Sequence, residues 1–464
     1  MSSLAKSESK LQFPSETACF TEGVNSLLRA ASRSSAVLQM GLILLCGAVF
    51  LTEGHRWDRS GLKDYSESAV ERADAASRGN NLRRIAYLAL GGTGVLLVLS
   101  SGKMPAIREP MGVFLFLAIA WTYSSVIWAD TFSFTLKRLL LLSLCAAGTV
   151  GLASCLSLKN LTVTVFGVTT AYLGIGIVAE IMQGNFRPWA SGYRFAGTLH
   201  PNAQASNCGA MVFSALALTR RSVEEIGMNF RKRKQIFRFI TGSLFVLGLF
   251  CLLLTKSRTA IAGVLLIVGL TWASRKSIGT NFIVGGMGLL LLFSLTYTVV
   301  VTGAGRDVGQ TANLGRDDSQ GAFNGRLPIW EICLRQLGRK SLIGCGYDGF
   351  WTGARIEDVS WELGWDISSA HSEFIEVVLG VGIIGLVLYA GVQFCGIGRF
   401  WYRYRNLGYG GDGLMMGMLL IGLIQGFMET GFLHPYSFGP FVTLCGIVRL
   451  AFFTDQITLR SGAV

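Results

Sequence analysis

Long apolar runs recur along almost the whole chain, and they constrain its fold more than any other feature. Each run is close to the length of about twenty residues that a helix needs to cross a lipid bilayer. The short alternating segments of a transmembrane barrel do not occur. The sequence therefore predicts an all-α polytopic membrane protein with about twelve transmembrane helices, at residues 36–51, 85–100, 112–128, 139–157, 161–182, 202–219, 237–254, 259–273, 281–301, 371–393, 413–431 and 437–453.

Composition agrees with a helical bundle in a membrane. Hydrophobic residues make up 51% of the chain and charged residues only 15%, and many of the 58 glycines lie in the apolar runs, where they let helices approach closely. Residues 1–35 are polar and no small-residue cleavage site follows, so we expect the first run to stay as a signal anchor. The ten cysteines fit no metal spacing. Cys333 and Cys345 share one polar loop, where either a disulfide or two free thiols is compatible with the sequence.

Basic residues predict the orientation of the bundle. The densest basic run lies at 220–238, and smaller groups lie at 275–276 and 399–405. Basic residues in short loops mark the cytoplasmic side. All three loops fall on that side if the N-terminus is cytoplasmic. The net charge of +13 then indicates cytoplasmic loops and contacts with anionic lipid, not nucleic acid.

This orientation divides the chain into five parts. They are a cytoplasmic tail at 1–35, transmembrane helices 1–9 at 36–301, a large outer loop at 302–370, transmembrane helices 10–12 at 371–453, and a cytoplasmic tail at 454–464. Inside the large loop, Pro328 and Gly338 suit the start and the end of a helix. Apolar residues repeat between them at helical spacing, which predicts an amphipathic helix with a face of Leu327, Trp330, Leu334 and Leu337.

Titratable residues collect at the outer ends of the predicted spans, and His371 is the first of them. It stands at the threshold of the run SSAHSEFIEVVLGVGIIGLVLYAG, residues 368–391. Eleven residues make about three helical turns, so His371 and Gly382 are expected on one helix face. That face, joined by Gly385, reads as a packing surface. On spacing alone, an interfacial polar residue is the favoured interpretation of His371.

Two further places carry charge near apolar runs. Lys256 and Arg258 occupy a short outer turn, TKSRTA, and an ionisable group there needs a partner or a function. We favour a function over an arginine that only reaches out to lipid headgroups. Arg194 and His200 precede a helix expected to start at Pro201. A helix N-terminus beside an arginine can bind an anion.

Arg326 and Glu429 are each open to two interpretations. Arg326 is either a functional group or a solvated loop charge. Glu429 is either the counter-ion of one of the arginines or a buried acid bonded to a neighbouring helix. Together with the other arginines and His371 they suggest a site for a diphosphate, which guanidinium groups bind through paired donors, next to a proton acceptor. No carboxylate cluster offers a metal site, so no metal or cofactor is expected.

Three short motifs resemble the O-antigen ligase and polymerase family, the membrane glycosyltransferases of bacterial surface polysaccharides. The resemblance covers roughly residues 110–450. The first motif is a histidine followed by Asn, Ser or Gln, nine residues, a glycine, two residues, and Gly, Thr or Tyr. His371, Ser372, Gly382 and Gly385 match it.

The second motif opens a helix and is matched by Ser257, Arg258, Thr259 and Ala260. The third is matched by Gly325, Arg326 and Trp330, followed by the turn with Gly344 and Gly346.

The resemblance implies a fold of the C-type glycosyltransferase class in the bacterial inner membrane, with a large periplasmic loop before helix 10. It implies a metal-independent, inverting transfer of a glycan from undecaprenyl diphosphate to a sugar hydroxyl, on another lipid-linked repeat in polymerases or on lipid A–core in ligases. His371 would be the base. The diphosphate would be held by Arg258 and Arg194, with Arg326 a weaker candidate, and Lys256, His200 and Glu429 in support.

The segment GYDGFW, residues 346–351, is more similar to the exopolysaccharide polymerases of the family, so polymerisation is favoured over ligation. Membrane lipids and proteins of polysaccharide export or chain-length control are the expected partners. The competing interpretation is a lipid-linked oligosaccharide transporter or flippase. Transporters place charged groups near the bilayer midplane. The predicted span centres here carry almost none, which favours chemistry at the interface. The role of residues 1–84 is open.

Overall fold

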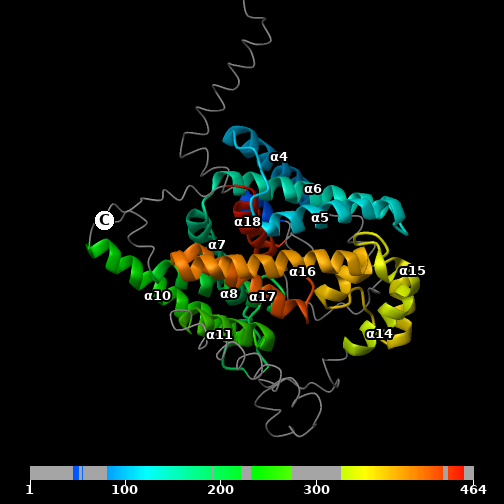
Figure 1. Cartoon of the computed structure of the whole chain (residues 1–464). Helices are drawn as coiled ribbons and strands as arrows, with labels where there is room; N and C mark the ends of the chain where they lie inside the picture. Colours follow the sequence, from blue (N-terminus) through cyan, green and yellow to red (C-terminus); the bar gives the residue numbers. More distant parts are fainter. Residues whose placement is uncertain are drawn as a thin grey trace, which may run out of the picture.

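The computed structural model describes residues 45–51, 55, 81–190, 192–220, 231–273, 326–431 and 437–453. The tails at 1–35 and 454–464, the predicted span at 281–301, most of the predicted first span and Gly325 lie outside these residues. Within the described ranges, every regular element is a helix (Figure 1). The chain is therefore all-helical there, as predicted.

In the described ranges, helices occupy the predicted apolar runs. Most boundaries shift by a few residues, but the helix predicted to end at 393 continues to Leu407. The elements are α4 (Asn81–Ser101), α5 (Pro110–Ser124), the 3₁₀ helix η1 (Ser125–Trp128), α6 (Phe132–Cys155), α7 (Leu158–Met182), α8 (Pro201–Arg220), α10 (Arg231–Leu254), α11 (Arg258–Ala273), α14 (Arg326–Leu337), the 3₁₀ helix η3 (Gly338–Leu342), α15 (Gly353–Leu363), α16 (Glu373–Leu407), α17 (Gly410–Gly426) and α18 (Phe438–Phe452).

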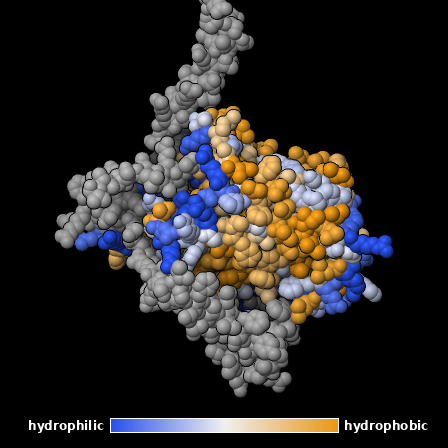
Figure 2. Space-filling model, in the orientation of Figure 1, coloured by the Kyte–Doolittle hydropathy of each residue, from blue (hydrophilic) through white to orange (hydrophobic). Residues whose placement is uncertain are grey.

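Among the described residues, 6 helical segments are long and apolar enough to cross a membrane. They are Asn81–Ser101, Pro110–Trp128, Phe132–Cys155, Leu158–Met182, Gln235–Leu254 and Glu373–Leu407. Shorter apolar helices cover Arg258–Thr271, Gly410–Gly426 and Phe438–Phe452. Figure 2 shows a broad apolar surface across the middle of one face, with hydrophilic residues toward its ends. These features fit a polytopic membrane protein, while the count of twelve spans stays a prediction.

Small residues let the helices pack closely, as the composition indicated. The long helix α16 crosses the middle of the molecule beside α5 and α17, and α4 packs along α6 (Figure 1). At the crossing of α4 and α6, a Cβ added to Gly94 would lie 2.3 Å from the carbonyl oxygen of Ala147. A Cβ on Gly151 would lie equally close, 2.3 Å, to the carbonyl oxygen of Gly94. Glycine therefore allows backbone-to-backbone contact here.

The predicted amphipathic helix exists as α14, but its buried face differs from the predicted one. Leu327 and Leu334 are exposed, and the core contacts come from Ile329, Ile332, Cys333 and Leu337. The buried residues belong to a second apolar core that α14 forms with α15, the 345–350 segment and the start of α16. Cys333 and Cys345 are both buried in it as free thiols, not a disulfide.

Helix α16 is broken at Gly382, where the loop that follows η3 crosses it. Gly382 has φ 74° and ψ −176° inside an otherwise helical segment. Two carbonyl groups at the break are hydrogen-bonded from outside the helix: the Cys345 N–H donates to the Leu379 oxygen at 2.9 Å, and the Trp121 indole donates to the Val381 oxygen at 2.8 Å. The expected continuous stripe from His371 through Gly382 is therefore wrong, because α16 begins after His371 and changes course at Gly382.

Candidate functional site

His371 occupies the loop immediately before α16, in a backbone conformation that is rare for a residue with a side chain. Its φ is 49°, in the left-handed region. The side chain is half-buried. Burial lowers the pKa of the imidazole below its ordinary value of 6.5; the negative charge of Glu429 opposes this shift and the positive charge of Arg326 adds to it. The ring is therefore neutral near pH 7 and able to accept a proton.

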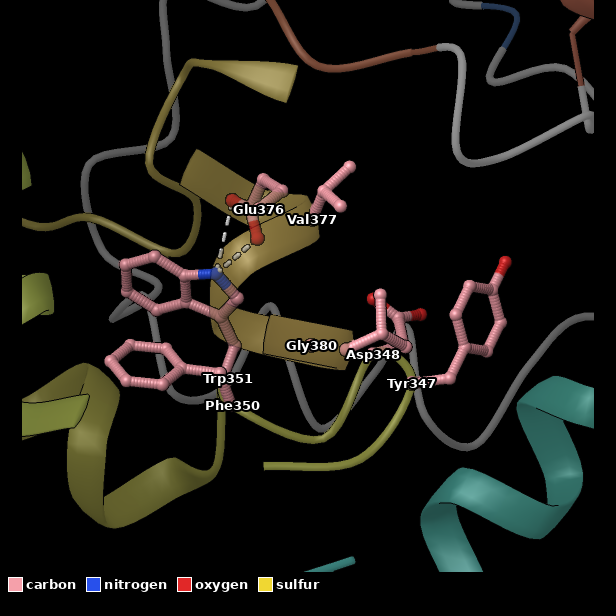
Figure 3. A pocket seen from close by; sticks show the side chains of 8 residues that line it. Tyr347, Asp348, Phe350, Trp351, Glu376, Val377 and Gly380 are labelled. Carbon is pink, nitrogen blue, oxygen red and sulfur yellow. Dashed lines mark hydrogen bonds between the residues drawn. The ribbon is translucent and has the colours of Figure 1, made fainter. Parts of the chain in front are cut away.

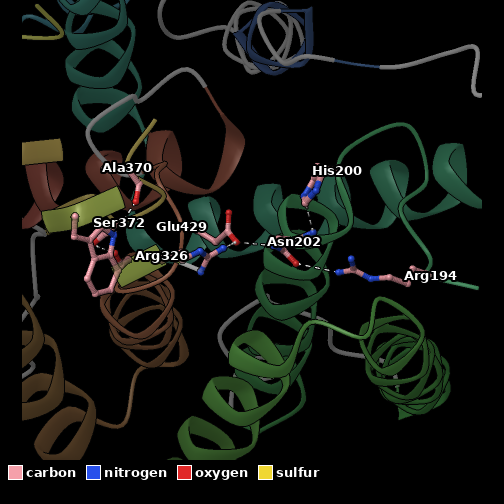
Figure 4. A network of polar contacts seen from close by, with 9 residues as sticks. Arg194, His200, Asn202, Arg326, Ala370, Ser372 and Glu429 are labelled. Carbon is pink, nitrogen blue, oxygen red and sulfur yellow. Dashed lines mark hydrogen bonds and ion pairs between the residues drawn. The ribbon is translucent and has the colours of Figure 1, made fainter. Parts of the chain in front are cut away.

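An ion pair lies beside His371. Arg326, the first residue of α14, places one guanidinium nitrogen 2.9 Å from Oε1 of Glu429, which follows the end of α17. The same carboxylate oxygen accepts a hydrogen bond of 2.6 Å from the side-chain amide of Asn202, in the first turn of α8. Figure 4 shows how these three side chains meet. The ends of three helices, distant in sequence, are joined at one carboxylate.

Arg194 extends this cluster toward the turn between α10 and α11. Its guanidinium donates to the Asn202 side-chain oxygen at 3.2 Å and to the backbone oxygen of Thr255 at 3.0 Å. His200 accepts a bond of 3.3 Å from the backbone N–H of Asn202 through Nδ1. Two of the three arginines predicted to bind diphosphate are thus linked through Asn202 and Glu429 (Figure 4).

Lys256 and Arg258 join the cluster through the backbone of their turn. Thr255, whose carbonyl oxygen binds Arg194, directly precedes Lys256, which has φ 52°. Arg258 is the first residue of α11. All seven predicted site residues therefore lie at helix ends or in adjoining loops that the contacts bring to one end of the bundle. Because α8, α11, α14 and α16 begin there, their N-terminal dipoles favour an anion at this end.

Glu180 and Asn202, which sequence reasoning missed, organise this region. Glu180 of α7 is buried, and one of its oxygens accepts the N–H groups of Ala196 and Gly197 at 2.9 and 2.8 Å. Its other oxygen binds the Tyr193 hydroxyl. The loop that carries Arg194 is thus anchored to an acid inside α7. An acidic residue within an apolar run was the available signal.

The GYDGFW segment lines a small pocket against the first half of α16. Tyr347, Asp348, Phe350 and Trp351 face the Glu376–Val381 stretch of that helix (Figure 3). The Trp351 indole N–H lies 3.0 and 3.1 Å from the two carboxylate oxygens of Glu376. This segment therefore contacts the helix that His371 precedes.

Three ion pairs fix the GYDGFW segment and its neighbours to α6 and to the turn between α5 and α6. Asp348 pairs with Arg138 at 3.0 Å. Asp130, in the turn itself, pairs with Arg355 at 2.6 Å and with Lys340. In the part of the chain that the structure describes, no three His, Cys, Asp or Glu side chains lie together as a group that could hold a metal ion.

Part of the chain matches a known protein family. Residues 243–390 match the family described as O-antigen ligase, and that range includes Arg258, Arg326, His371 and Gly382. This part of the chain is therefore similar to O-antigen ligases. The resemblance predicted from the three motifs is thereby confirmed.

One curated protein similar to this chain is the exopolysaccharide production protein ExoQ of Rhizobium meliloti (strain 1021). The two are 26% identical over 223 residues, which is 45% of this chain and 49% of ExoQ. The chain therefore matches about half the length of this relative. Both comparisons support a function of the O-antigen ligase and polysaccharide polymerase type.

Proposed function

We propose that the chain is a polysaccharide polymerase that acts at the periplasmic face of the bacterial inner membrane. It would transfer a growing glycan from undecaprenyl diphosphate to a hydroxyl of another lipid-linked repeat. One observation carries the proposal: a half-buried, neutral histidine lies beside an Arg–Glu pair that side-chain contacts connect to further arginines at the same end of the bundle. The match of residues 243–390 to the O-antigen ligase family supports the same reaction class.

The proposed reaction is a single displacement at the anomeric carbon of the donor sugar. The acceptor hydroxyl oxygen forms the new glycosidic bond while its proton passes to an imidazole nitrogen of His371. The bond between the anomeric carbon and the diphosphate oxygen breaks, and its electron pair leaves with undecaprenyl diphosphate. A single displacement inverts the anomeric configuration. Positioned general-base catalysis of this kind typically contributes about 10²- to 10⁴-fold to a rate.

Charge on the departing diphosphate would be stabilised by Arg258 and Arg194, without a metal ion. Both lie where helices α8 and α11 begin, and the positive ends of those helices add to the guanidinium charge. Arg326 is the weaker candidate because its charge is offset by Glu429 at 2.9 Å. We place the Arg326–Glu429 pair next to His371. Lys256 and His200 would lie at the edge of the diphosphate site.

Polymerisation is favoured over ligation by the similarity to an exopolysaccharide production protein and by the GYDGFW segment. The same proposal places residues 302–370 in the periplasm and the tails at 1–35 and 454–464 in the cytoplasm. Proteins of polysaccharide export or chain-length control would receive the product.

The break in α16 is the feature that would support a transporter, because transporters often contain broken helices. At this break, however, the hydrogen bonds to the Leu379 and Val381 carbonyls come from the protein's own backbone and a tryptophan, not from charged groups. The ionisable residues gather instead at the helix ends. This distribution favours transfer chemistry at the membrane surface.

The deciding experiment offers the purified chain two acceptors. The donor is the lipid-linked oligosaccharide that accumulates in cells lacking the protein, and the acceptors are the same lipid-linked repeat and lipid A–core. We expect longer lipid-linked glycans together with released undecaprenyl diphosphate. Transfer to lipid A–core alone would reassign the chain as a ligase. Movement of the donor across vesicles without any new glycosidic bond would overturn the proposal in favour of a flippase.

A further inference from the structure

The residue that precedes His371, Ala370, is held by hydrogen bonds to both of its polar backbone groups. The N–H of Ala370 donates a hydrogen bond of 2.6 Å to Oε1 of Glu376, and the carbonyl oxygen of Ala370 accepts one of 2.8 Å from the indole of Trp330. Ala370 itself is fully buried. Ala370 is labelled in Figure 4, and Glu376 in Figure 3.

These contacts act on the torsion that orients His371. The Ala370 carbonyl belongs to the peptide plane that ends at the His371 nitrogen, so the Trp330 bond fixes one side of the φ rotation. The other side is fixed by the start of α16, where the Glu373 N–H donates to the Glu429 carbonyl oxygen at 3.1 Å. A φ of 49° is unfavourable for a residue with a side chain and persists only where the surroundings impose it.

A second layer of contacts holds the first. The Trp351 indole binds both carboxylate oxygens of Glu376. Trp351 is the last residue of the GYDGFW segment. Hydrogen bonds therefore connect this segment to Glu376, and Glu376 to the backbone of Ala370, the residue before His371. Trp330 lies in the middle of α14, which the Arg326–Glu429 pair joins to the end of α17. Two tryptophans of the 302–370 loop thus converge on one short loop before α16.

From these contacts we infer that Glu376 and Trp330 are positioning residues for His371. Their hydrogen bonds to the N–H and the carbonyl oxygen of Ala370, which we call the clamp, orient the imidazole toward the acceptor hydroxyl. This inference rests on the proposed role of His371 as the base. Neither residue needs to touch substrate, and neither exchanges a proton in the reaction. A loosened clamp lets the ring move away from its reactive position and exposes it to water. Misplacement of a reacting group by about 1 Å can cost about 10²-fold in rate.

The test compares three variants with wild type in the transfer assay described above. Trp330→Phe keeps the ring and removes the indole donor, Glu376→Ala removes the acceptor, and Glu376→Gln keeps an oxygen that can accept the Ala370 N–H. Per folded molecule, we expect Trp330→Phe and Glu376→Ala to lower kcat about 10- to 100-fold while the donor KM stays within about two-fold. Glu376→Gln should recover most of the loss.

The pH dependence of the rate distinguishes a loss of imidazole orientation from a loss of protein stability. The groups whose charge acts on His371 are Glu429 and Arg326, and all three clamp variants retain them. Extra water around the ring should move the acid limb of the kcat/KM profile upward, toward the ordinary histidine value of 6.5. The control is Glu362→Ala, an acid of the same loop that pairs with Arg335 on the exposed surface. It should change neither kcat nor the acid limb.

The inference is overturned if folded Trp330→Phe keeps the wild-type kcat and acid limb. It is also overturned if the variants yield less folded protein but each folded molecule keeps the wild-type kcat. Should Glu376→Ala not fold, Trp330→Phe decides in the same way. His371→Asn distinguishes this inference from the proposed function. Full activity of His371→Asn overturns the function, whereas an inactive His371→Asn beside unaltered clamp variants overturns only the clamp.

Discussion

Replacing Gly382 by alanine should destabilise the protein by several kilocalories per mole. A Cβ at this position would lie 2.1 Å from the carbonyl oxygen of Leu342 and 2.4 Å from the backbone nitrogen of Ile343. Both are backbone atoms of the crossing loop, so no side-chain rotation can relieve the overlap. In addition, φ 74° with ψ −176° is a region that almost only glycine occupies. Strain of about 1–3 kcal/mol and overpacking of about 1–3 kcal/mol together predict a loss of about 2–6 kcal/mol.

The matched control for Gly382→Ala is Gly398→Ala, on the second half of the same helix. No atom lies within 4 Å of a Cβ at Gly398. Alanine is therefore expected there to leave stability unchanged or raise it by about 0.5–1 kcal/mol through helix propensity. Denaturant titration of both variants in mixed micelles measures the free energy of unfolding. If Gly382→Ala is as stable as Gly398→Ala, the break in α16 and its contact with the crossing loop are not as described.

Two further predictions concern the site itself. Burial lowers the pKa of His371 in the free protein, and a base must be neutral to act, so the acid limb of the wild-type kcat/KM profile should lie below pH 6.5. A limb at or above that value contradicts the assigned environment. Glu180→Ala leaves the N–H groups of Ala196 and Gly197 without their acceptor, and it should lower the free energy of unfolding by about 2–5 kcal/mol in the same titration. An unchanged stability would mean that Glu180 does not anchor the loop of Arg194.

The sequence predicts the helices well because lipid imposes a simple rule on them. A run of apolar residues long enough to cross the bilayer must satisfy its own backbone, and the helix is the local solution. The bounds of α4, α7 and α11 therefore lie within a few residues of the predicted runs. Helix α16 extends to Leu407, well past the predicted end at 393, because polar residues continue a helix after the apolar pattern stops.

The error at His371 and Gly382 has a physical cause. Helical spacing relates two residues only if the helix between them is continuous, and nothing local in the sequence reveals that a distant loop crosses at Gly382. Glycine is equally common as a packing residue, which made the stripe the simpler interpretation. The contact with Leu342 and the hydrogen bond to Cys345 depend on tertiary structure.

The residues of the candidate site could be predicted from the sequence, but the contacts between them could not. Charged residues at the ends of apolar runs stood out as Arg194, Arg258, Arg326, His371 and Glu429, because such residues need partners. Which partners they have could not be read from spacing. The pairing of Arg326 with Glu429 spans 103 residues. The amide of Asn202, which links Glu429 to Arg194, resembles many polar residues in the first turn of a helix.

The most direct test of the central claim is a single-turnover measurement with purified protein and the labelled lipid-linked donor. The account predicts that wild type forms one glycosidic bond for each undecaprenyl diphosphate released. His371→Asn and Arg258→Ala, folded and inserted normally, should carry out both events at least about 10²-fold more slowly. Transfer at the wild-type rate by either folded variant would contradict the assignment of that residue, and transfer at that rate by both would contradict the site as a whole.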